Sequence, residues 1–173
     1  GFGCVYTDIT DDVNTLEKAI VEFEHATTHD QLTGIYNRIY LDETFNRIIS
    51  RPGKGMAFVM VDVDNFSYYN NEYGHGVGDR ILQAIAHRIQ STVRSSDVVA
   101  RWAGDEFSIL LIDIPKAQAV RVLYEVRDAV SGNALYSDLF GSVTIGFNWT
   151  DKQNVDPEEF ANGADLALIQ QKR

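Results

Sequence analysis

Cysteine and positive charge are both scarce in this chain of 173 residues. Its single thiol, that of Cys4, excludes an internal disulfide and suits a reducing compartment, so we expect a cytoplasmic domain. No apolar run reaches transmembrane length and no signal peptide is visible, so we expect no direct membrane contact. The 25 acidic residues outnumber the 15 lysines and arginines, and the net charge is −10. This balance argues against nucleic-acid binding, and an anionic ligand needs a cation to bring it in.

Hydrophobic residues make up 45% of the chain, which is enough for the core of one ordinary domain. The apolar run 56–63 is typical of a central strand covered on both faces. Residues 97–114 have the pattern of two strands joined by a turn at 103–106, and helical spacing marks the segments on either side. We therefore predict an α/β fold, an α+β sandwich in which helices pack on a mixed, mostly antiparallel sheet.

The N-terminal segment contains two different patterns. Residues 1–10 alternate like a short strand. Apolar residues then recur at spacings of three, four and three, at Val13, Leu16, Ile20 and Phe23. This spacing predicts a helix over 11–28, either the seam of a coiled coil or an ordinary amphipathic helix. Because the chain offers no obvious surface for this helix, we expect a partner chain to cover it.

Four acidic residues are candidates for a metal site. Asp62 and Asp64 follow the central apolar run two residues apart, which directs both side chains to the same side. Asp105 and Glu106 occupy the predicted hairpin turn. If the hairpin lies next to the central strand, these carboxylates converge, and a divalent ion such as Mg²⁺ offsets their repulsion. The alternative is that all four are ordinary exposed turn residues, and spacing alone leaves both interpretations open.

Two further segments admit a structural and a functional interpretation. After the apolar run we expect a loop, "NNEYGHGVGD", that leads into one long helix. Its stretch "GHGVGD" at 74–79 lacks the lysine of a phosphate-binding loop, so Asp79 is either a helix cap or a ligand contact. Asn70, just ahead of it, has an amide that can bind a base edge. Arg94 and Asp97 in "RSSD" form a local ion pair in the simpler interpretation.

Taken in order, the motifs resemble the GGDEF family of diguanylate cyclases over about residues 28–173. "DQLTGIYNR" is similar to the family's opening motif, and "VDVDNF", Asn70, "YGHGVGD" and "AGDEF" follow at the family's spacing. "SVTIGF" and "ADLAL" resemble its closing strand and helix. The resemblance implies a sheet of about five strands surrounded by helices, similar to the palm of nucleotidyl cyclases and polymerases. It also implies condensation of two GTP into cyclic di-GMP, with Mg²⁺ or Mn²⁺ as cofactor.

The same resemblance assigns roles to individual residues. Asp105 and Glu106 match the catalytic acids, and the implied metal ligands are Asp62, the Val63 carbonyl, Asp105 and Glu106. The implied substrate-binding positions are Asn65, Phe66, Asn70, Asp79 and Lys172, of which Asn70 and Asp79 recognise guanine and Lys172 contacts phosphate. Arg94 and Asp97 lie at the family's distance from the signature turn for a product-inhibition site that binds cyclic di-GMP.

The resemblance also implies an organisation and partners. Residues 1–10 resemble the end of an upstream PAS-like sensor domain, 11–28 a signalling helix, and 29–173 the GGDEF domain. The expected partners are GTP, cyclic di-GMP, a second copy held through the N-terminal helix with facing active sites, the upstream sensor, and a downstream phosphodiesterase domain.

Several positions depart from the family pattern, and two of them bear most on phosphate binding. Ala103 replaces the first glycine of the signature turn, and Ser67 replaces a lysine that contacts phosphate. These departures favour an alternative in which the domain is catalytically degenerate, binds GTP or cyclic di-GMP, and regulates a linked domain. The retained acids favour the enzyme.

Overall fold

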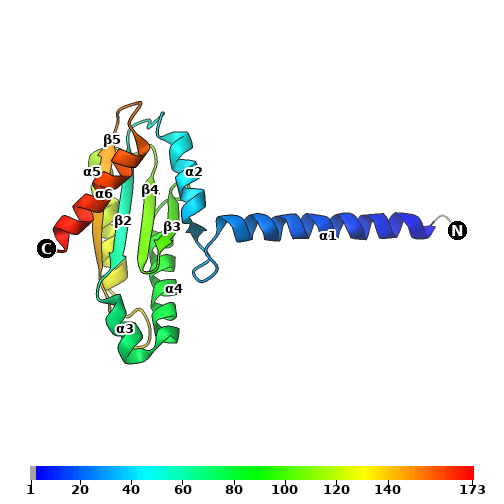
Figure 1. Cartoon of the computed structure of the whole chain (residues 1–173), viewed down its shortest axis with the longest axis horizontal. Coiled ribbons are helices and arrows are strands. Elements are labelled where there is room, and N and C mark those ends of the chain that lie inside the picture. The colour runs from blue at the N-terminus through cyan, green and yellow to red at the C-terminus, as the bar shows by residue number, and fades with distance from the viewer. Residues whose placement is uncertain (1–2) are drawn as a thin grey trace.

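The computed structural model describes residues 3–173, and its core is a five-stranded sheet with the strand order β1-β3-β4-β2-β5 (Figure 1). Only β1 and β3 run parallel; the other neighbours are antiparallel. This confirms the predicted fold class. The elements, in chain order, are α1 (Gly3–Thr28), β1 (Tyr36–Asn37), α2 (Arg38–Ile48), β2 (Met56–Val63), α3 (Phe66–Tyr73), α4 (His75–Thr92), β3 (Val98–Ala103), β4 (Glu106–Leu111), α5 (Lys116–Ser131), β5 (Val143–Thr150) and α6 (Pro157–Gln171).

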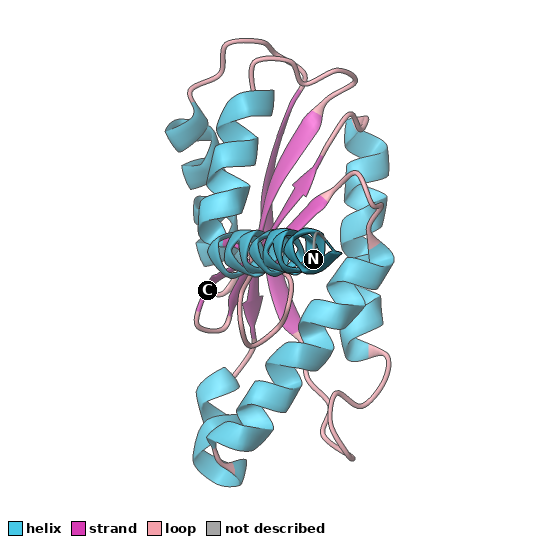
Figure 2. Ribbon diagram, turned by 90° about the vertical axis from the view of Figure 1, so that its right-hand side faces the viewer, coloured by secondary structure: helices cyan, strands magenta, loops and turns pink. Residues whose placement is uncertain are grey.

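Strand β2 is apolar along most of its length because helices cover both faces of the sheet (Figure 2). Side chains of a strand alternate between the faces. Val59 and Val61 accordingly pack in one core cluster with residues of α4 and α5, whereas Phe58 and Met60 pack in a second with residues of α2 and α6. The two clusters hold β2 and its neighbours β4 and β5 in a fixed register, which positions the residues at the strand ends.

Helix α1 is longer than the sequence predicts and projects away from the rest of the chain (Figure 1). It begins at Gly3, so the short strand expected over residues 1–10 is wrong for 3–10, while Gly1 and Phe2 lie outside the described residues. The strand-like alternation there contains no helix-breaking proline, and the helix continues through it. An upstream PAS-like domain stays a prediction. Within the described residues, no helix is both long and apolar enough to cross a membrane.

The segment after β2 forms two helices rather than the expected loop before one helix. Helix α3 ends at Tyr73, the chain turns at Gly74, whose φ of 88° favours glycine, and α4 begins at His75. Asp79 therefore lies inside α4, and its interpretation as the cap of that helix is wrong. The glycines that suggested a loop are accommodated in the corner and the first turns of α4.

Arg88 of α4 binds the backbone at the end of α5. Its guanidinium donates to the carbonyl oxygens of Val130 (3.0 Å), Asn133 (2.8 Å) and Ala134 (2.6 Å). Val130 lies in the last turn of α5, where carbonyls have no partner within the helix, and Asn133 and Ala134 follow the end of the helix. The Arg88 side chain therefore supplies donors to carbonyls that no helical hydrogen bond satisfies.

Replacing Arg88 by methionine is expected to lower the free energy of unfolding by about 2 kcal/mol, because part-buried carbonyls lose their donors. Urea denaturation measures the loss. Arg80→Met, at an exposed position of the same helix, is the control and should change stability by less than about 0.5 kcal/mol. Equal effects of the two substitutions would show that Arg88 has no special structural role.

Candidate active site

The signature turn places its acids beside the end of the central strand. Strands β2 and β4 are antiparallel neighbours, and Asp62 pairs with Glu106 in their register. The backbone N–H of Val63 donates to the carbonyl of Asp105 at 3.1 Å, so this residue lies at the same end of the sheet. The predicted convergence of Asp62, Asp105 and Glu106 is therefore present.

Glu106 lies in an acidic environment. Burial raises the pKa of its carboxyl group, and the charges of Asp62, Asp105 and Asp165 raise it further, while Lys172 opposes the shift. Lys172 forms an ion pair with Asp62 through Nζ and Oδ1. Sequence reasoning missed Asp165. Its signal was the spacing of seven to Lys172, which puts both residues on one side of α6.

Asp64 does not join this group, contrary to the expectation from its spacing. Its carboxylate accepts hydrogen bonds from the hydroxyls of Ser142 (2.5 Å) and Thr144 (2.6 Å). Strand β2 ends at Val63, so the alternation of side chains in a strand no longer governs Asp64. This carboxylate instead fastens the end of β2 to the start of β5.

The donors at this end of the sheet fit a magnesium ion that is shared with a substrate. Among residues 3–173, no group of three or more histidine, cysteine, aspartate or glutamate side chains is arranged as a metal cage. Mg²⁺ does not need one, since it typically takes one or two carboxylates and fills its octahedron with waters and phosphate oxygens. Asp62 and Glu106, paired across two strands, supply two carboxylates, and the mutual repulsion that raises the Glu106 pKa is what a cation relieves.

Ala103 is compatible with the backbone of the turn. The positive φ of the turn, 30°, belongs to Gly104, and Ala103 is not among the non-glycine residues with positive φ. Arg101, which sequence reasoning missed, also holds this turn: its Nε donates to the Gly104 carbonyl at 3.0 Å and its Nη1 pairs with Asp30. The substitution of the first signature glycine therefore introduces no backbone strain.

The predicted guanine-binding residues come together where α3 meets α4. Asn65 precedes α3 in the left-handed conformation, and Phe66 is the first residue of that helix. A Cβ on Gly78 would lie 1.9 Å from Oδ1 of Asn70 and 3.2 Å from the Phe66 ring. The side chain of Asn70 therefore packs on the bare backbone of Gly78, directly before the exposed Asp79.

Gly78→Ala is expected to displace Asn70 and raise the Kd for GTP at least about tenfold, the equivalent of one lost hydrogen bond. Isothermal titration calorimetry measures this Kd. Gly76→Ala, in the same helix, is the matched control, because a Cβ there meets open space and should leave the Kd unchanged. A normal Kd for Gly78→Ala would remove Asn70 from the recognition site.

Arg94 and Asp97 form a closed ion pair at the opposite end of β3 from the signature turn. Nη2 of Arg94 lies 2.9 Å from Asp97 Oδ1 and also donates to the Ile112 carbonyl at 2.6 Å. The Asp97 side chain is only 1% exposed and accepts from the backbone N–H groups of Arg94 and Ile112. This geometry matches the local ion pair, and a product-binding role stays a proposal.

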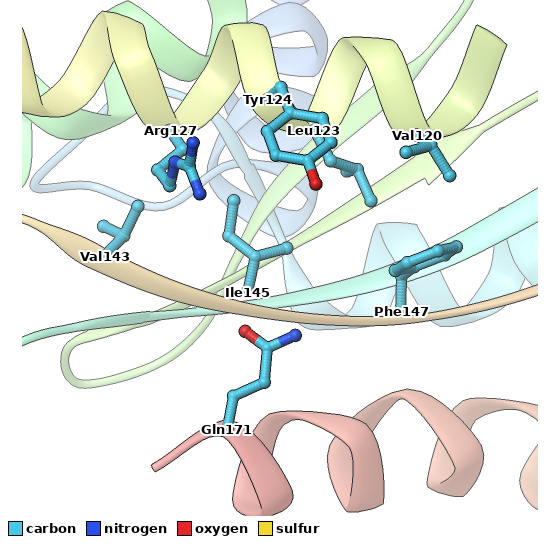
Figure 3. Close-up of a pocket in the computed structure, with 8 residues that line it drawn as sticks. All are labelled: Val120, Leu123, Tyr124, Arg127, Val143, Ile145, Phe147 and Gln171. Carbon is cyan, nitrogen blue, oxygen red and sulfur yellow. The ribbon is translucent and has the colours of Figure 1, made fainter. Parts of the chain in front are cut away.

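A pocket of 170 Å³ lies between α5 and β5 (Figure 3). Tyr124 and Arg127 of α5 border it above the strand, and Gln171 of α6 borders it on the other side. Its walls contain none of the predicted site residues. Its wall nevertheless reaches the acidic end of the sheet, because Val143 pairs with Val63 in the register of β2 and β5.

The comparisons with known proteins agree with this geometry. The chain is 38% identical over 151 residues to the uncharacterized protein YtrP of Bacillus subtilis, with 87% of this chain and 25% of YtrP covered. It superposes on the diguanylate cyclase SiaD of Pseudomonas aeruginosa, solved with its activator SiaC, with a TM-score of 0.79 and 31% identity, covering 97% of this chain and 67% of that one. The coiled coil and GGDEF domain of DgcB from Caulobacter crescentus, at 23% identity, shares the fold with a TM-score of 0.88, covering 98% and 93%.

The chain spans between 21% and 41% of the lengths of eight curated relatives, so it corresponds to one part of them. The family described as "Diguanylate cyclase, GGDEF domain" matches residues 27–173, which is all of the chain beyond α1 and the last two residues of that helix. The acidic turn next to the central strand, the five-stranded sheet and this match together establish that the chain belongs to the GGDEF domain family.

Proposed function

We propose that this chain is a diguanylate cyclase that condenses two GTP into cyclic di-GMP and pyrophosphate as a Mg²⁺- or Mn²⁺-dependent dimer. The observation that carries the proposal is the pairing of Asp62 with Glu106 across β2 and β4, beside Asp105 in the turn. Membership of the GGDEF family and the 31% identity to SiaD, a diguanylate cyclase, support a role in cyclic di-GMP chemistry.

The residues divide the chemistry among them. Asp62, the Val63 carbonyl, Asp105 and Glu106 would hold the divalent ion, which when bound neutralises charge on the triphosphate. Asp105 and Glu106 assist removal of the proton from the 3′-hydroxyl, whose oxygen forms a bond to the α-phosphorus of the facing GTP as the bond to pyrophosphate breaks.

The residues where α3 meets α4 select the substrate. The Asp79 carboxylate accepts from the N–H groups on the Watson–Crick edge of guanine, and Asn70 supplies amide hydrogen bonds. Adenine offers no such pair of donors, so the site selects GTP. Asn65 and Phe66 shape the entry to α3, and Lys172 contacts phosphate.

A second copy of the chain is required, because cyclic di-GMP contains two nucleotides and one domain binds only one GTP. Helix α1 suits this role: Ile9, Val13, Leu16, Ile20 and Phe23 recur at spacings of four and three along it and are exposed in the single chain. Two such helices side by side would bury the stripe and bring two domains together. The same proposal includes a cytoplasmic location, an upstream sensor domain and a downstream phosphodiesterase domain. It also includes feedback inhibition by cyclic di-GMP bound at Arg94 and Asp97.

The competing function is a degenerate module that binds GTP or cyclic di-GMP without turning it over. Ser67 favours it, since a phosphate-binding lysine is lost. Ala103 favours it less, because the positive φ of the turn belongs to Gly104. The intact acid group weighs toward the enzyme.

The deciding experiment is GTP turnover with Mg²⁺ by the dimeric protein, with products separated by chromatography and identified by mass. Cyclic di-GMP that disappears in Asp105→Ala supports the cyclase. Measurable GTP binding by the dimer without product contradicts it and supports the binding module.

A further inference from the structure

Lys172 reaches from the end of α6 to a carboxylate of the candidate metal site. It caps α6, with its backbone N–H bonded to the Leu168 carbonyl, and its Nζ contacts Oδ1 of Asp62 at the end of β2. The Lys172 side chain is 41% exposed, whereas that of Asp62 is 14% exposed. A partly exposed cation therefore neutralises a mostly buried anion.

Helix α6 is anchored on the sheet up to Leu168, four residues before Lys172. Helix α6 lies directly on β5, where a Cβ on Gly146 would come within 2.4 Å of the Ala164 carbonyl oxygen and 2.2 Å of the Leu168 nitrogen. Leu168 is buried in the core. Release of Asp62 therefore requires only a change in the side chain of Lys172, without displacement of the anchored part of α6.

We propose that Lys172 is an exchangeable counter-ion of Asp62, which a divalent ion displaces and which then passes to the triphosphate. This inference rests on the proposed function. An ammonium group and a divalent ion repel each other and compete for the same carboxylate oxygen. The displaced ammonium would face Glu106 and Asp165, and a bound triphosphate gives it a stronger anionic partner.

The exchange makes the binding of metal and of nucleotide cooperative. A bare divalent ion must break the Lys172–Asp62 pair without bringing a phosphate group for the displaced ammonium, so it binds weakly. A metal–nucleotide complex brings the new partner of Lys172 with it.

The exchange is tested in the full chain by measuring how Lys172 variants bind the bare metal ion and the metal–nucleotide complex, because the two affinities should change in opposite directions. Electron paramagnetic resonance of free Mn²⁺ gives the Kd of the bare ion, and calorimetry with a non-hydrolysable Mn²⁺–GTP analogue gives that of the complex. Lys172→Met and Lys172→Gln should bind bare Mn²⁺ about tenfold more tightly and the Mn²⁺–nucleotide complex about tenfold more weakly, within the usual range of coupling between sites. Arg173→Met is the control: it removes the same charge one residue further on and should change either Kd less than about twofold.

The outcomes separate the inference from the proposed function. Lys172 variants that weaken both affinities, or that behave like Arg173→Met, overturn the counter-ion exchange and leave the cyclase standing. A wild-type protein that does not bind the Mn²⁺–nucleotide complex contradicts the proposed function itself.

Discussion

Glu106→Gln is expected to lower cyclic di-GMP formation by about 10³-fold, the usual loss when a charged group that acts in the transition state is neutralised. The amide keeps the size of the side chain, but it neither accepts the proton of the 3′-hydroxyl nor balances the charge of a divalent ion. Turnover of GTP measured at saturating Mg²⁺ tests this expectation. Glu125→Gln, the same change at an exposed position of α5, should retain full activity.

The same substitution should make the metal-free protein more stable. Glu106 pairs with Asp62 across β2 and β4, and like charges directly opposite in a sheet are destabilising. Removing one charge should raise the free energy of unfolding by about 0.5 kcal/mol, read from thermal melts in EDTA. A variant that loses both activity and stability would indicate damage to the fold rather than loss of a catalytic group.

The stability that Glu106→Gln adds should be larger at neutral pH than in acid. The folded protein holds the Glu106 pKa above its usual value of 4.5, so the folded state binds the proton more tightly than the unfolded state. The destabilisation by the charged form is therefore full at pH values above the raised pKa and disappears below pH 4.5, where both states are protonated. The difference in melting temperature between Glu106→Gln and wild type should be largest at neutral pH and vanish in acid.

The sequence predicts this site well wherever strand geometry alone determines it. The apolar run 56–63 identifies a strand covered on both faces, and its hairpin neighbour follows from the turn at 103–106. Together they bring Asp62 to Glu106 without knowledge of the helices. The position of Asp64 was not predicted, because its carboxylate is bound by the hydroxyls of Ser142, directly before β5, and Thr144, on β5, which lie about 80 residues later in the chain.

The contributions of α6 were harder to foresee. The Lys172–Asp62 pair and the nearby Asp165 depend on how closely α6 approaches the sheet, and that distance is set by the missing side chain of Gly146. Long-range packing of this kind leaves little trace in local patterns. The first residues of α1 show the opposite limitation: ten residues of alternation are too short to distinguish a strand from the start of a long helix.

Leu16→Glu is expected to convert the proposed dimer to a monomer. Cyclic di-GMP formation should then fall at least about 100-fold at equal protein concentration, because two active sites no longer face each other. Leu16 lies in the middle of the apolar stripe of α1 and is 63% exposed in the single chain. A charge there is costly only if a second helix buries the stripe, because an exposed glutamate is a good helix former. The Kd for GTP per domain should stay unchanged, because α1 projects away from the sheet that carries the acids (Figure 1).

Val21→Glu is the matched control for the stripe. Val21 is apolar, belongs to the same helix and is 64% exposed, but it lies outside the four-and-three spacing that joins Ile9 to Phe23. Sedimentation equilibrium should find Val21→Glu dimeric and active, and Leu16→Glu monomeric and inactive. If both variants dimerise as wild type does, α1 is not the dimer contact, and the two active sites must be brought together by another surface. If both become monomeric, the contact covers more of α1 than one seam, and the coiled-coil geometry is wrong even though the helix is the interface.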